Sequence, residues 1–184
     1  MLVIEWQQFL KNGISSETRQ ISMTVGIFDG IHRGHQALIE RVVSHNAKFV
    51  PAVVTFRQNH KTNNGDILTF RQRLEKLENL GIQIIIVIDF TEEFKMMPGI
   101  EFLQILLNHG NIGFFTVGSD FRCGYRLDTD AETIKKFFTS HDIPAEIVPQ
   151  VMEGSQPVSS SRIRSAIAEG DTELAQMMLG YNIQ

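Results

Sequence analysis

An unbroken apolar run near the middle of the chain most strongly limits the folds open to it. The segment IQIIIVIDF, residues 82–90, shows no alternation of apolar and polar side chains. A strand with one solvated face alternates, whereas a strand buried on both faces reads as a continuous apolar run. Such strands belong to parallel sheets that helices cover on both sides. The helical pattern before it is closed by Gly81, so the run begins cleanly after a helix.

Short β-rich apolar runs and amphipathic helical patterns alternate along the whole chain. Strands are predicted at residues 21–28, 51–56, 82–90 and 113–118 and, more weakly, at 145–151. Helices are predicted at residues 34–46, 70–81, 99–110 and 130–138, with two more beginning at 159–161 and at Asp171. Repeated strand, helix, strand units predict an α/β fold, with a parallel sheet and helices on both faces. A chain of 184 residues supports one sizeable core, so we expect residues 1–184 to form a single domain.

Charge and cysteine content narrow the class of protein. The formal net charge of -4 argues against a broad surface for nucleic acid or an anionic membrane. Cys123 is the only cysteine, which leaves no intramolecular disulfide and no cysteine-cluster metal site. The N-terminal segment lacks the pattern of a secretory signal, and no apolar stretch reaches transmembrane length. We therefore expect a soluble, cytoplasmic protein, with one mobile polar loop at residues 57–66.

The stretch TVGIFDGIHRGHQALIERV, residues 24–42, places glycines and histidines between a strand and a helix. In parallel α/β sheets, ligands bind beyond the carboxyl ends of strands, above all where the strand order reverses. Gly26 and Gly30 allow a sharp turn, and the first amides of the helix can bind an anion. His32 and His35 are three residues apart, so both rings can face one ligand. Imidazoles that donate to phosphoryl oxygens favour phosphate as that ligand.

Other interpretations of this stretch are weaker. The glycines do not match the G-x-G-x-x-G spacing of dinucleotide-binding folds. A metal pair is less favoured, because the neighbouring sequence does not complete a set of ligands. A purely structural role for both histidines remains open.

Several segments, taken in order, carry a family resemblance. H-x-G-H after a first strand resembles the nucleotidyltransferase superfamily, and GIFDGIHRGHQALI is similar to the adenylylating module of prokaryotic bifunctional riboflavin kinase/FMN adenylyltransferases, the FAD synthetases. The segments ILTFRQRLEKLENLGIQIIIVIDFTEEF, TVGSDFRCG and VSSSRIRSAIAEGDTELAQMMLG resemble the same module. The resemblance spans about residues 24–180 and implies a Rossmann-like nucleotidyltransferase fold.

The resemblance also implies an activity, the transfer of AMP from ATP to FMN to give FAD and pyrophosphate. It implies catalytic roles for His32, His35 and Arg164. Nucleotide-binding positions follow in the same way: Gly26, Phe28, Asp29, Gly30, Asp120, Ser160 and Ser161. Asp120 could instead cap a loop, and the serine triplet could instead cap a helix. Mg²⁺ is expected with ATP, and it is assigned no protein ligand.

The chain departs from the family pattern on the acceptor side. The usual T-F-D-P-x-P is replaced by TFRQNH, residues 55–60, which places Phe56, Arg57 and Asn59 at the acceptor site. Arg57 is expected either to bind an acceptor phosphate or to be solvated. Cys123 is expected to be a small buried apolar residue. Most of the 13 phenylalanines are expected in the core, not stacked on a flavin.

The end of the chain and its first residues add two further expectations. In the bifunctional family a riboflavin kinase module follows the LLG ending, whereas this chain stops at LGYNIQ, so kinase activity is expected to be absent. Trp6 precedes the matching segments and is assigned no role.

Three functions stay open at this stage. The first is an FMN adenylyltransferase without kinase activity. The second is a related nucleotidyltransferase with another phosphorylated acceptor, which the TFRQNH stretch favours. The third is a nucleotide-binding protein that has lost turnover, against which the retained histidines and Arg164 argue.

Overall fold

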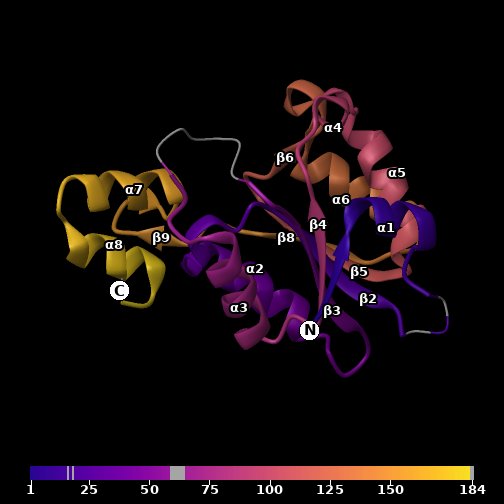
Figure 1. The fold of residues 1–184 in the computed structure, drawn as a ribbon, viewed down its shortest axis with the longest axis horizontal. Coiled ribbons are helices and arrows are strands. Elements are labelled where there is room, and N and C mark those ends of the chain that lie inside the picture. The colour runs from indigo at the N-terminus through magenta and orange to yellow at the C-terminus, as the bar shows by residue number, and fades with distance from the viewer. Residues whose placement is uncertain (16, 18, 59–64, 183–184) are drawn as a thin grey trace.

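The computed structural model describes residues 1–15, 17, 19–58 and 65–182. One sheet of six parallel strands runs through its centre, in the order β1-β4-β3-β2-β5-β8 (Figure 1). The strands are β1 (Leu2–Glu5), β2 (Ile21–Val25), β3 (Val50–Phe56), β4 (Ile84–Ile88), β5 (Ile112–Gly118) and β8 (Ala145–Val148). The predicted α/β fold with a parallel sheet is therefore confirmed.

Strand β4 shows why its sequence is continuously apolar. Ile84, Ile86 and Ile88 belong to one hydrophobic cluster, whereas Ile85 and Val87 belong to another. Successive side chains of a strand point to opposite faces of the sheet, so the two clusters cover the two faces. Both faces of β4 are buried, as the sequence predicted.

Helices cover both faces of the sheet (Figure 1). The cluster around Ile86 contains apolar side chains of α1 (Trp6–Asn12), α5 (Gly99–Gly110) and α6 (Ala131–Thr139). The cluster around Ile85 contains those of α2 (Arg33–Val43) and α3 (Phe70–Asn79). Each helix thus buries one apolar stripe, which is what an amphipathic pattern predicts.

The C-terminal helices have a small core of their own. Helices α7 (Ser160–Ala168) and α8 (Thr172–Leu179) pack together and lie to one side of the sheet in Figure 1. Their cluster of buried residues consists of Val158, Ile163, Ala166, Ala175, Met178 and Leu179. Ser159 caps α7 and Asp171 caps α8, each with a side chain that accepts a backbone N–H. Both helices begin where the sequence predicted.

Several short elements join the main ones. Helix α4 (Glu92–Met96) precedes α5, and the 3₁₀ turns are η1 (Asp29–Ile31) and η2 (Tyr125–Leu127). Two antiparallel ribbons pair β6 (Arg122–Cys123) with β7 (Thr129–Asp130) and β9 (Met152–Glu153) with β10 (Gln156–Pro157). Five residues of α4 are too few to produce a helical period in sequence, so this helix was not predicted.

The expectation that the strand before the H-x-G-H stretch is the first of the sheet was wrong. Strand β1 comes earlier in the chain and pairs with β4 at the sheet edge. Strand β2 lies inside the sheet, between β3 and β5. Trp6, which carried no predicted role, is buried and stacks on Phe9 with ring centroids 5.4 Å apart.

Element boundaries differ from the prediction by a few residues. The strand predicted at 21–28 ends at Val25, because the chain turns at Gly26. Strand β8 ends before the predicted 151. Most of the loop predicted at 57–66 falls on residues 59–64, which lie outside the described residues. Among the described residues, no helix combines the length and the hydropathy that a membrane crossing requires.

Candidate active site

The strand order reverses at β2. From β2 the chain adds β3 and β4 on one side, and later adds β5 and β8 on the other. In an open parallel sheet, such a reversal leaves a crevice at the carboxyl ends of the strands. A cavity of about 450 Å³ lies there, and its walls include Val25 at the end of β2 and Gly118 at the end of β5.

The turn after β2 depends on two glycines. Phe28 is fully buried with a left-handed backbone (φ 57°), and it folds back over Gly26. A Cβ on Gly26 would lie 3.1 Å from the Phe28 ring. Gly30 also has a left-handed backbone (φ 78°), and a Cβ there would lie 2.9 Å from Ile67. At position 30 only glycine meets both the backbone and the space requirement without strain, whereas Gly26 leaves room for the Phe28 ring. This turn delivers the chain to His32.

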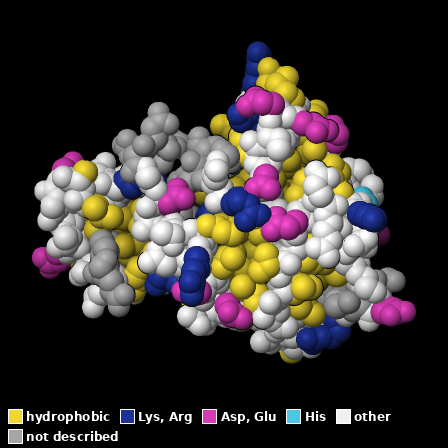
Figure 2. All heavy atoms as spheres, viewed as in Figure 1, with side chains coloured by type: hydrophobic (Ala, Val, Ile, Leu, Met, Phe, Trp, Pro, Cys, Tyr) yellow, Lys and Arg dark blue, Asp and Glu magenta, His cyan; other side chains and the backbone are white. Residues whose placement is uncertain are grey.

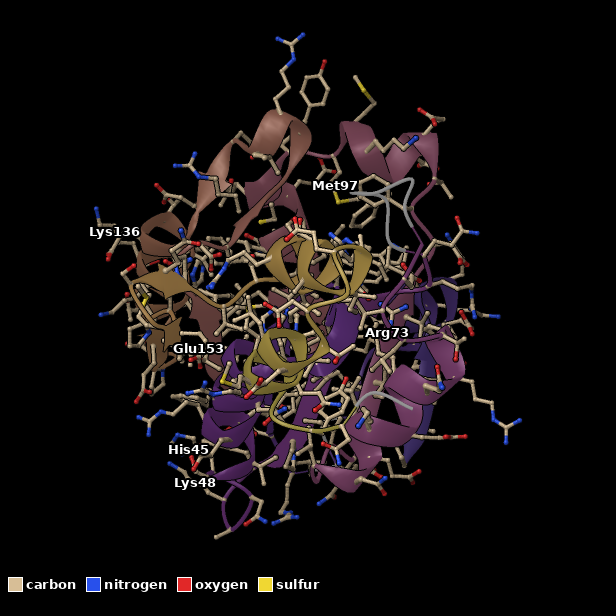
Figure 3. All side chains as sticks on the ribbon, turned by 90° about the vertical axis from the view of Figure 1, so that its left-hand side faces the viewer. His45, Lys48, Arg73, Met97, Lys136 and Glu153 are labelled. Atoms are coloured by element: carbon tan, nitrogen blue, oxygen red, sulfur yellow. The ribbon has the colours of Figure 1, made fainter. Side chains whose placement is uncertain are left out.

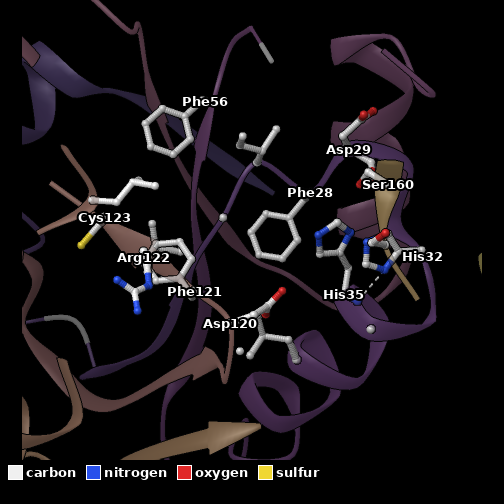
Figure 4. A pocket seen from close by; sticks show the side chains of 18 of the residues that line it. Phe28, Asp29, His32, His35, Phe56, Asp120, Phe121, Arg122, Cys123 and Ser160 are labelled. Carbon is white, nitrogen blue, oxygen red and sulfur yellow. Dashed lines mark hydrogen bonds between the residues drawn. The ribbon is translucent and has the colours of Figure 1, made fainter. Parts of the chain in front are cut away.

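The two histidines of the turn stack on each other. Their ring centroids are 3.7 Å apart with an interplanar angle of 16°. His32 is the N-cap of α2, and its Nδ1 accepts the backbone N–H of His35 at 3.3 Å. Figure 4 shows Phe28, His35 and His32 in a row, with Asp120 nearby. The predicted placement of both rings on one side of the turn is thus observed, and both line the cavity.

Burial decides the charge of His32. The residue is 7% exposed, and desolvation lowers the pKa of its imidazole to about 4, against an opposing effect of the Asp120 carboxylate. The ring is therefore neutral near pH 7. Because Nδ1 accepts a hydrogen bond, the proton lies on Nε2, which makes Nε2–H the available donor. Gly34 packs closely against this ring, since a Cβ at that position would lie 3.2 Å from Nδ1 of His32.

Asp29 connects the turn to the C-terminal helices. Its carboxylate accepts the backbone N–H of Ile67 at 2.8 Å and forms an ion pair with Arg164 at 2.5 Å. Asp29 is 3% exposed, and burial raises the pKa of its carboxyl group while the Ile67 amide and the Arg164 charge oppose that rise. Asp29 thereby holds the Arg164 guanidinium at the cavity wall.

In the serine triplet, one hydroxyl caps α7 and another bonds to the turn after β2. Ser159 caps α7 by accepting the backbone N–H of Arg162. Ser160 donates its hydroxyl proton to the carbonyl oxygen of Asp29 at 2.9 Å, so it fastens α7 to the turn. Ser161 is exposed. All three serines line the cavity. Helix capping thus applies to Ser159, one residue before the two serines predicted to bind nucleotide.

Further polar contacts hold α7 and α8 against the turn, on the side that Figure 3 faces. The Tyr181 hydroxyl donates to the carbonyl oxygen of Gly30 at 2.5 Å. Gln36 donates through Nε2 to the carbonyl oxygens of Ile31, at 2.8 Å, and Leu179, at 2.7 Å. The C-terminal helices therefore complete the cavity wall beside the histidines, where Ser160 lies next to His32 (Figure 4).

The other end of the cavity is aromatic. Most of the 13 phenylalanines are buried, as the sequence predicted, but several partly buried ones line this end. Besides Phe28, the phenylalanines on its walls are Phe56, Phe90, Phe94, Phe102 and Phe121. Phe94 makes edge contacts with Phe56 at 5.8 Å and with Phe102 at 5.7 Å. Phe56 ends β3 and Phe90 follows β4, so both stand at carboxyl ends of neighbouring strands. That position was the signal in the sequence that separates them from core phenylalanines.

Comparison with known proteins decides the family. Residues 14–162 match the FAD synthetase family. The chain belongs to this family. A bifunctional riboflavin kinase/FMN adenylyltransferase from Buchnera aphidicola subsp. Acyrthosiphon pisum is 27% identical, over 86% of this chain and 53% of that protein. A FAD synthetase from Listeria monocytogenes is 26% identical, over 91% of this chain and 71% of that protein. The chain spans about half the length of the bifunctional relatives that it matches.

Solved structures share the fold. A macrolide-efflux protein from Streptococcus pneumoniae superimposes with a TM-score of 0.86 and 27% identity, over 100% of this chain and 63% of that one. TmcAL from Thermotoga maritima, solved with alpha-thio ATP, gives a TM-score of 0.58 at 12% identity, over 86% of this chain and 52% of that one. The resemblance to the FAD synthetase family seen in the sequence is confirmed by the family match over residues 14–162.

The three residues predicted at the acceptor site of this FAD synthetase family member do not all line the cavity. Phe56 lines the cavity, whereas Asn59 lies outside the described residues. Arg57 is not part of the cavity wall. Its guanidinium bonds to Glu5 at 2.6 Å and to Asp89 at 2.8 Å, which ties the ends of β1, β3 and β4 together. It is therefore an ion-paired arginine whose side chain is 37% exposed.

Two other predicted positions have distinct surroundings. Gly30 is not part of the cavity wall either, and its carbonyl is bonded by Tyr181. Cys123 does line the cavity, and burial raises the pKa of its thiol to about 12. The thiol is therefore protonated near pH 7 and a poor nucleophile.

Proposed function

We propose that this FAD synthetase family member is an FMN adenylyltransferase, which transfers AMP from ATP to FMN and releases pyrophosphate. One observation carries the proposal: a single cavity has hydrogen-bond donors and a cation at one end and a wall of phenylalanines at the other. The donors are His32, His35 and Arg164. A triphosphate requires the first end, and a planar apolar ring system fits the second.

In the proposed reaction, an oxygen of the FMN phosphate attacks the α-phosphorus of ATP. A new P–O bond forms, the bond from the α-phosphorus to the bridging oxygen breaks, and pyrophosphate leaves with the electron pair. Such a transfer depends mainly on positioning and on charge stabilisation. His32 suits that role as a neutral Nε2–H donor, which stabilises charge without a covalent intermediate.

Arg164 supplies a permanent positive charge at the same end. Its guanidinium keeps further N–H groups beside the one that bonds Asp29, and arginine presents them in a fixed fork. We assign nucleotide contacts to Gly26, Phe28, Asp29, Asp120, Ser160 and Ser161, all of which line the cavity. Gly30 shapes the turn through its backbone. Ser160 can still accept a hydrogen bond, because only its proton is used by Asp29.

Mg²⁺ is proposed to accompany ATP. Within the described part of the chain, there is no group of three or more His, Cys, Asp or Glu side chains that could hold a metal ion. We assign the ion no protein ligand. When bound to ATP, Mg²⁺ neutralises charge on the departing pyrophosphate. We also propose that residues 1–184 act as one nucleotidyltransferase domain, because α7 and α8 complete a cavity that begins at the sheet.

A direct assay tests the proposal. Purified protein is incubated with Mg²⁺, ATP and FMN, and both FAD and pyrophosphate are followed. We expect equal amounts of the two products. The variant His32→Asn should lower kcat by about 10² to 10³-fold, which is typical for removal of one donor to a developing oxyanion. His141→Asn is the matched control, because His141 is exposed and lies outside the cavity.

Other outcomes point to the alternative functions. If pyrophosphate forms only when another phosphorylated acceptor is added, that acceptor replaces FMN as the substrate. The altered TFRQNH stretch favours this alternative. Tight ATP binding without any turnover would indicate a nucleotide-binding protein. Full activity of His32→Asn would remove the catalytic role assigned to that imidazole.

A further inference from the structure

A charged side chain is fully buried beneath the cavity. Arg73 of α3 is 1% exposed and is the largest fully buried side chain of the described residues (labelled in Figure 3). Burying an ion is costly, and a well-packed apolar side chain in its place is often neutral or stabilising. Its surroundings on α3 are apolar, since Leu77 one turn further belongs to the hydrophobic cluster. Core packing alone therefore does not explain an arginine here.

The guanidinium of Arg73 joins two loops. One nitrogen, Nη1, donates to the carbonyl oxygen of Ile27 at 2.5 Å, and the other, Nη2, donates to the carbonyl oxygen of Arg57 at 3.0 Å. Ile27 follows β2 and lines the cavity, and Arg57 follows β3. The Arg57 N–H in turn donates to Ile88 at the end of β4, at 2.9 Å. The Arg73 side chain thus connects the segments that follow β2 and β3, and the backbone N–H of Arg57 extends the connection to β4.

Neighbouring groups hold the guanidinium in place. The Phe70 ring centroid lies 5.3 Å from Cζ of Arg73 and 5.1 Å from Cζ of Arg57. Both arginines therefore make cation–π contacts with the same ring. Burial lowers the pKa of Arg73, and the nearby Asp66 and Asp29 carboxylates oppose this. An arginine nevertheless stays protonated in proteins. Its rigid fork can reach two carbonyls at once, which the single ammonium of a lysine does less well.

We propose that Arg73 is a positioning residue that sets the separation between the two walls of the cavity. Ile27 belongs to the turn that carries Phe28 and leads to His32, and Arg57 follows Phe56 of the aromatic wall. The clamp therefore fixes the distance between the donor end and the acceptor end, without touching either substrate. In-line transfer requires that distance to be right to within a fraction of an ångström. This inference rests on the proposed function for its effect on rate.

The test compares Arg73→Met and Arg73→Lys with Arg71→Met. Arg71 lies on the same helix, and its side chain is 89% exposed in an ion pair with Glu75, so it is a matched control. We expect Arg73→Met to lower kcat by about 10²-fold, with a smaller change in KM for ATP, because misplacement affects the reacting geometry more than the phosphate contacts. Arg73→Lys should recover part of that loss, and Arg71→Met should match the wild type.

Hydrogen exchange provides a readout that does not depend on catalysis. In Arg73→Met, amides of residues 26–31 and 56–58 should exchange faster, while those of β5 keep the wild-type rate. Faster exchange in all strands alike would mean a general loss of stability and would overturn the proposal, as would wild-type kcat together with wild-type exchange at 26–31. If Arg73→Met does not fold, the same kcat and hydrogen-exchange measurements are made on Arg73→Lys. If the wild type forms no FAD, the proposed function fails while the exchange data still decide whether the clamp exists.

Discussion

Single residues after β2 determine where the catalytic groups of the proposed reaction lie. Phe28 and Ile31 have left-handed backbones, with φ of 57° and 38°, although neither is glycine. Such conformations cost about 1–3 kcal/mol each and persist only where surrounding contacts enforce them. Here Phe28 is packed in the core, and Gln36 bonds the Ile31 carbonyl. This strained turn leads into α2 in the orientation that stacks His32 on His35.

The pH dependence of stability should report the buried imidazole of His32. Its pKa is about 4 in the folded protein and about 6.5 in the unfolded chain, so the unfolded chain binds the proton more readily between these values. The contribution of the neutral His32 ring to the free energy of unfolding is therefore complete above about pH 6.5, and it is lost as the pH falls toward 4. We expect the free energy of unfolding, measured with urea, to fall between about pH 7.5 and pH 5 in both proteins. The fall should be about 2 kcal/mol smaller in His32→Gln than in the wild type. An equal pH dependence in both proteins would contradict the buried, neutral ring, and exposed His141→Gln serves as the control.

Replacing Gly34 by alanine should separate stability from activity. Alanine favours a helix by about 1 kcal/mol over glycine, so the fold should be kept. The new Cβ would lie 3.2 Å from Nδ1 and 3.3 Å from Cε1 of His32, which displaces the ring. We expect FAD formation to slow about tenfold, because small misplacement of a catalytic group is costly. Thermal unfolding and initial rates measure the two effects, and an unchanged rate would show that the ring tolerates the methyl group.

At the scale of elements, the cavity is closed by a unit with its own core. Helices α7 and α8 bury their apolar residues mainly against each other. Their attachment to the turn is largely polar, through Ser160, Arg164 and Tyr181. Polar contacts of this kind specify one orientation, whereas the separate core keeps the helices formed.

Adjacent methionines in α8 test this division. Met178 is fully buried in the C-terminal cluster, whereas Met177 is 45% exposed. Met178→Ala should destabilise the helix pair by about 2–5 kcal/mol, while Met177→Ala should have little effect. Hydrogen exchange should accelerate over residues 160–179 more than over the central strands, and ATP affinity should fall with it. Equal acceleration in the central strands would show that the C-terminal helices do not open separately.

At the scale of the whole molecule, the sheet brings together segments that are far apart in sequence. Side chains from three segments, within residues 25–35, 118–124 and 158–164, meet at one cavity. Lys and Arg side chains are interspersed with Asp and Glu side chains on the face drawn in Figure 2. At the donor end of the cavity, the positive charge and the hydrogen-bond donors come from local groups, Arg164 and the imidazoles.

Ligand binding should stabilise the whole fold because the cavity joins the sheet to the C-terminal helices. A non-hydrolysable ATP analogue at 100 times its Kd should raise the free energy of unfolding by about 2.7 kcal/mol. Adenosine at the same concentration should give a smaller shift, because the donors at His32, His35 and Arg164 have no phosphate to bind. Thermal or urea unfolding measures both shifts. Equal shifts for the two ligands would argue against a phosphate-binding end.

The sequence by itself determined the features that depend on local spacing. The continuous apolar run of β4 required burial on both faces, and the three-residue spacing of His32 and His35 put their rings together. The serine triplet and Asp171 marked the starts of α7 and α8 correctly. Backbone geometry carries each of these signals over a few residues, so no knowledge of strand order was needed.

Only the tertiary structure decided which distant residues share a wall. In the sequence, Phe56 and Phe90 stand out only because each ends an apolar run, and nothing there shows that the two runs become neighbouring strands. Arg57 resembles a solvated loop residue. Strand order places β3 beside β4 and β2 beside β5, which turns the phenylalanines into one end of a cavity. Because β4 lies between β1 and β3, Arg57 also gains two carboxylate partners, Glu5 at the end of β1 and Asp89 after β4. Arg73 shows the same limit, because a charged residue in an amphipathic helix predicts exposure. Its burial follows from loops that meet only when parallel strands align their carboxyl ends.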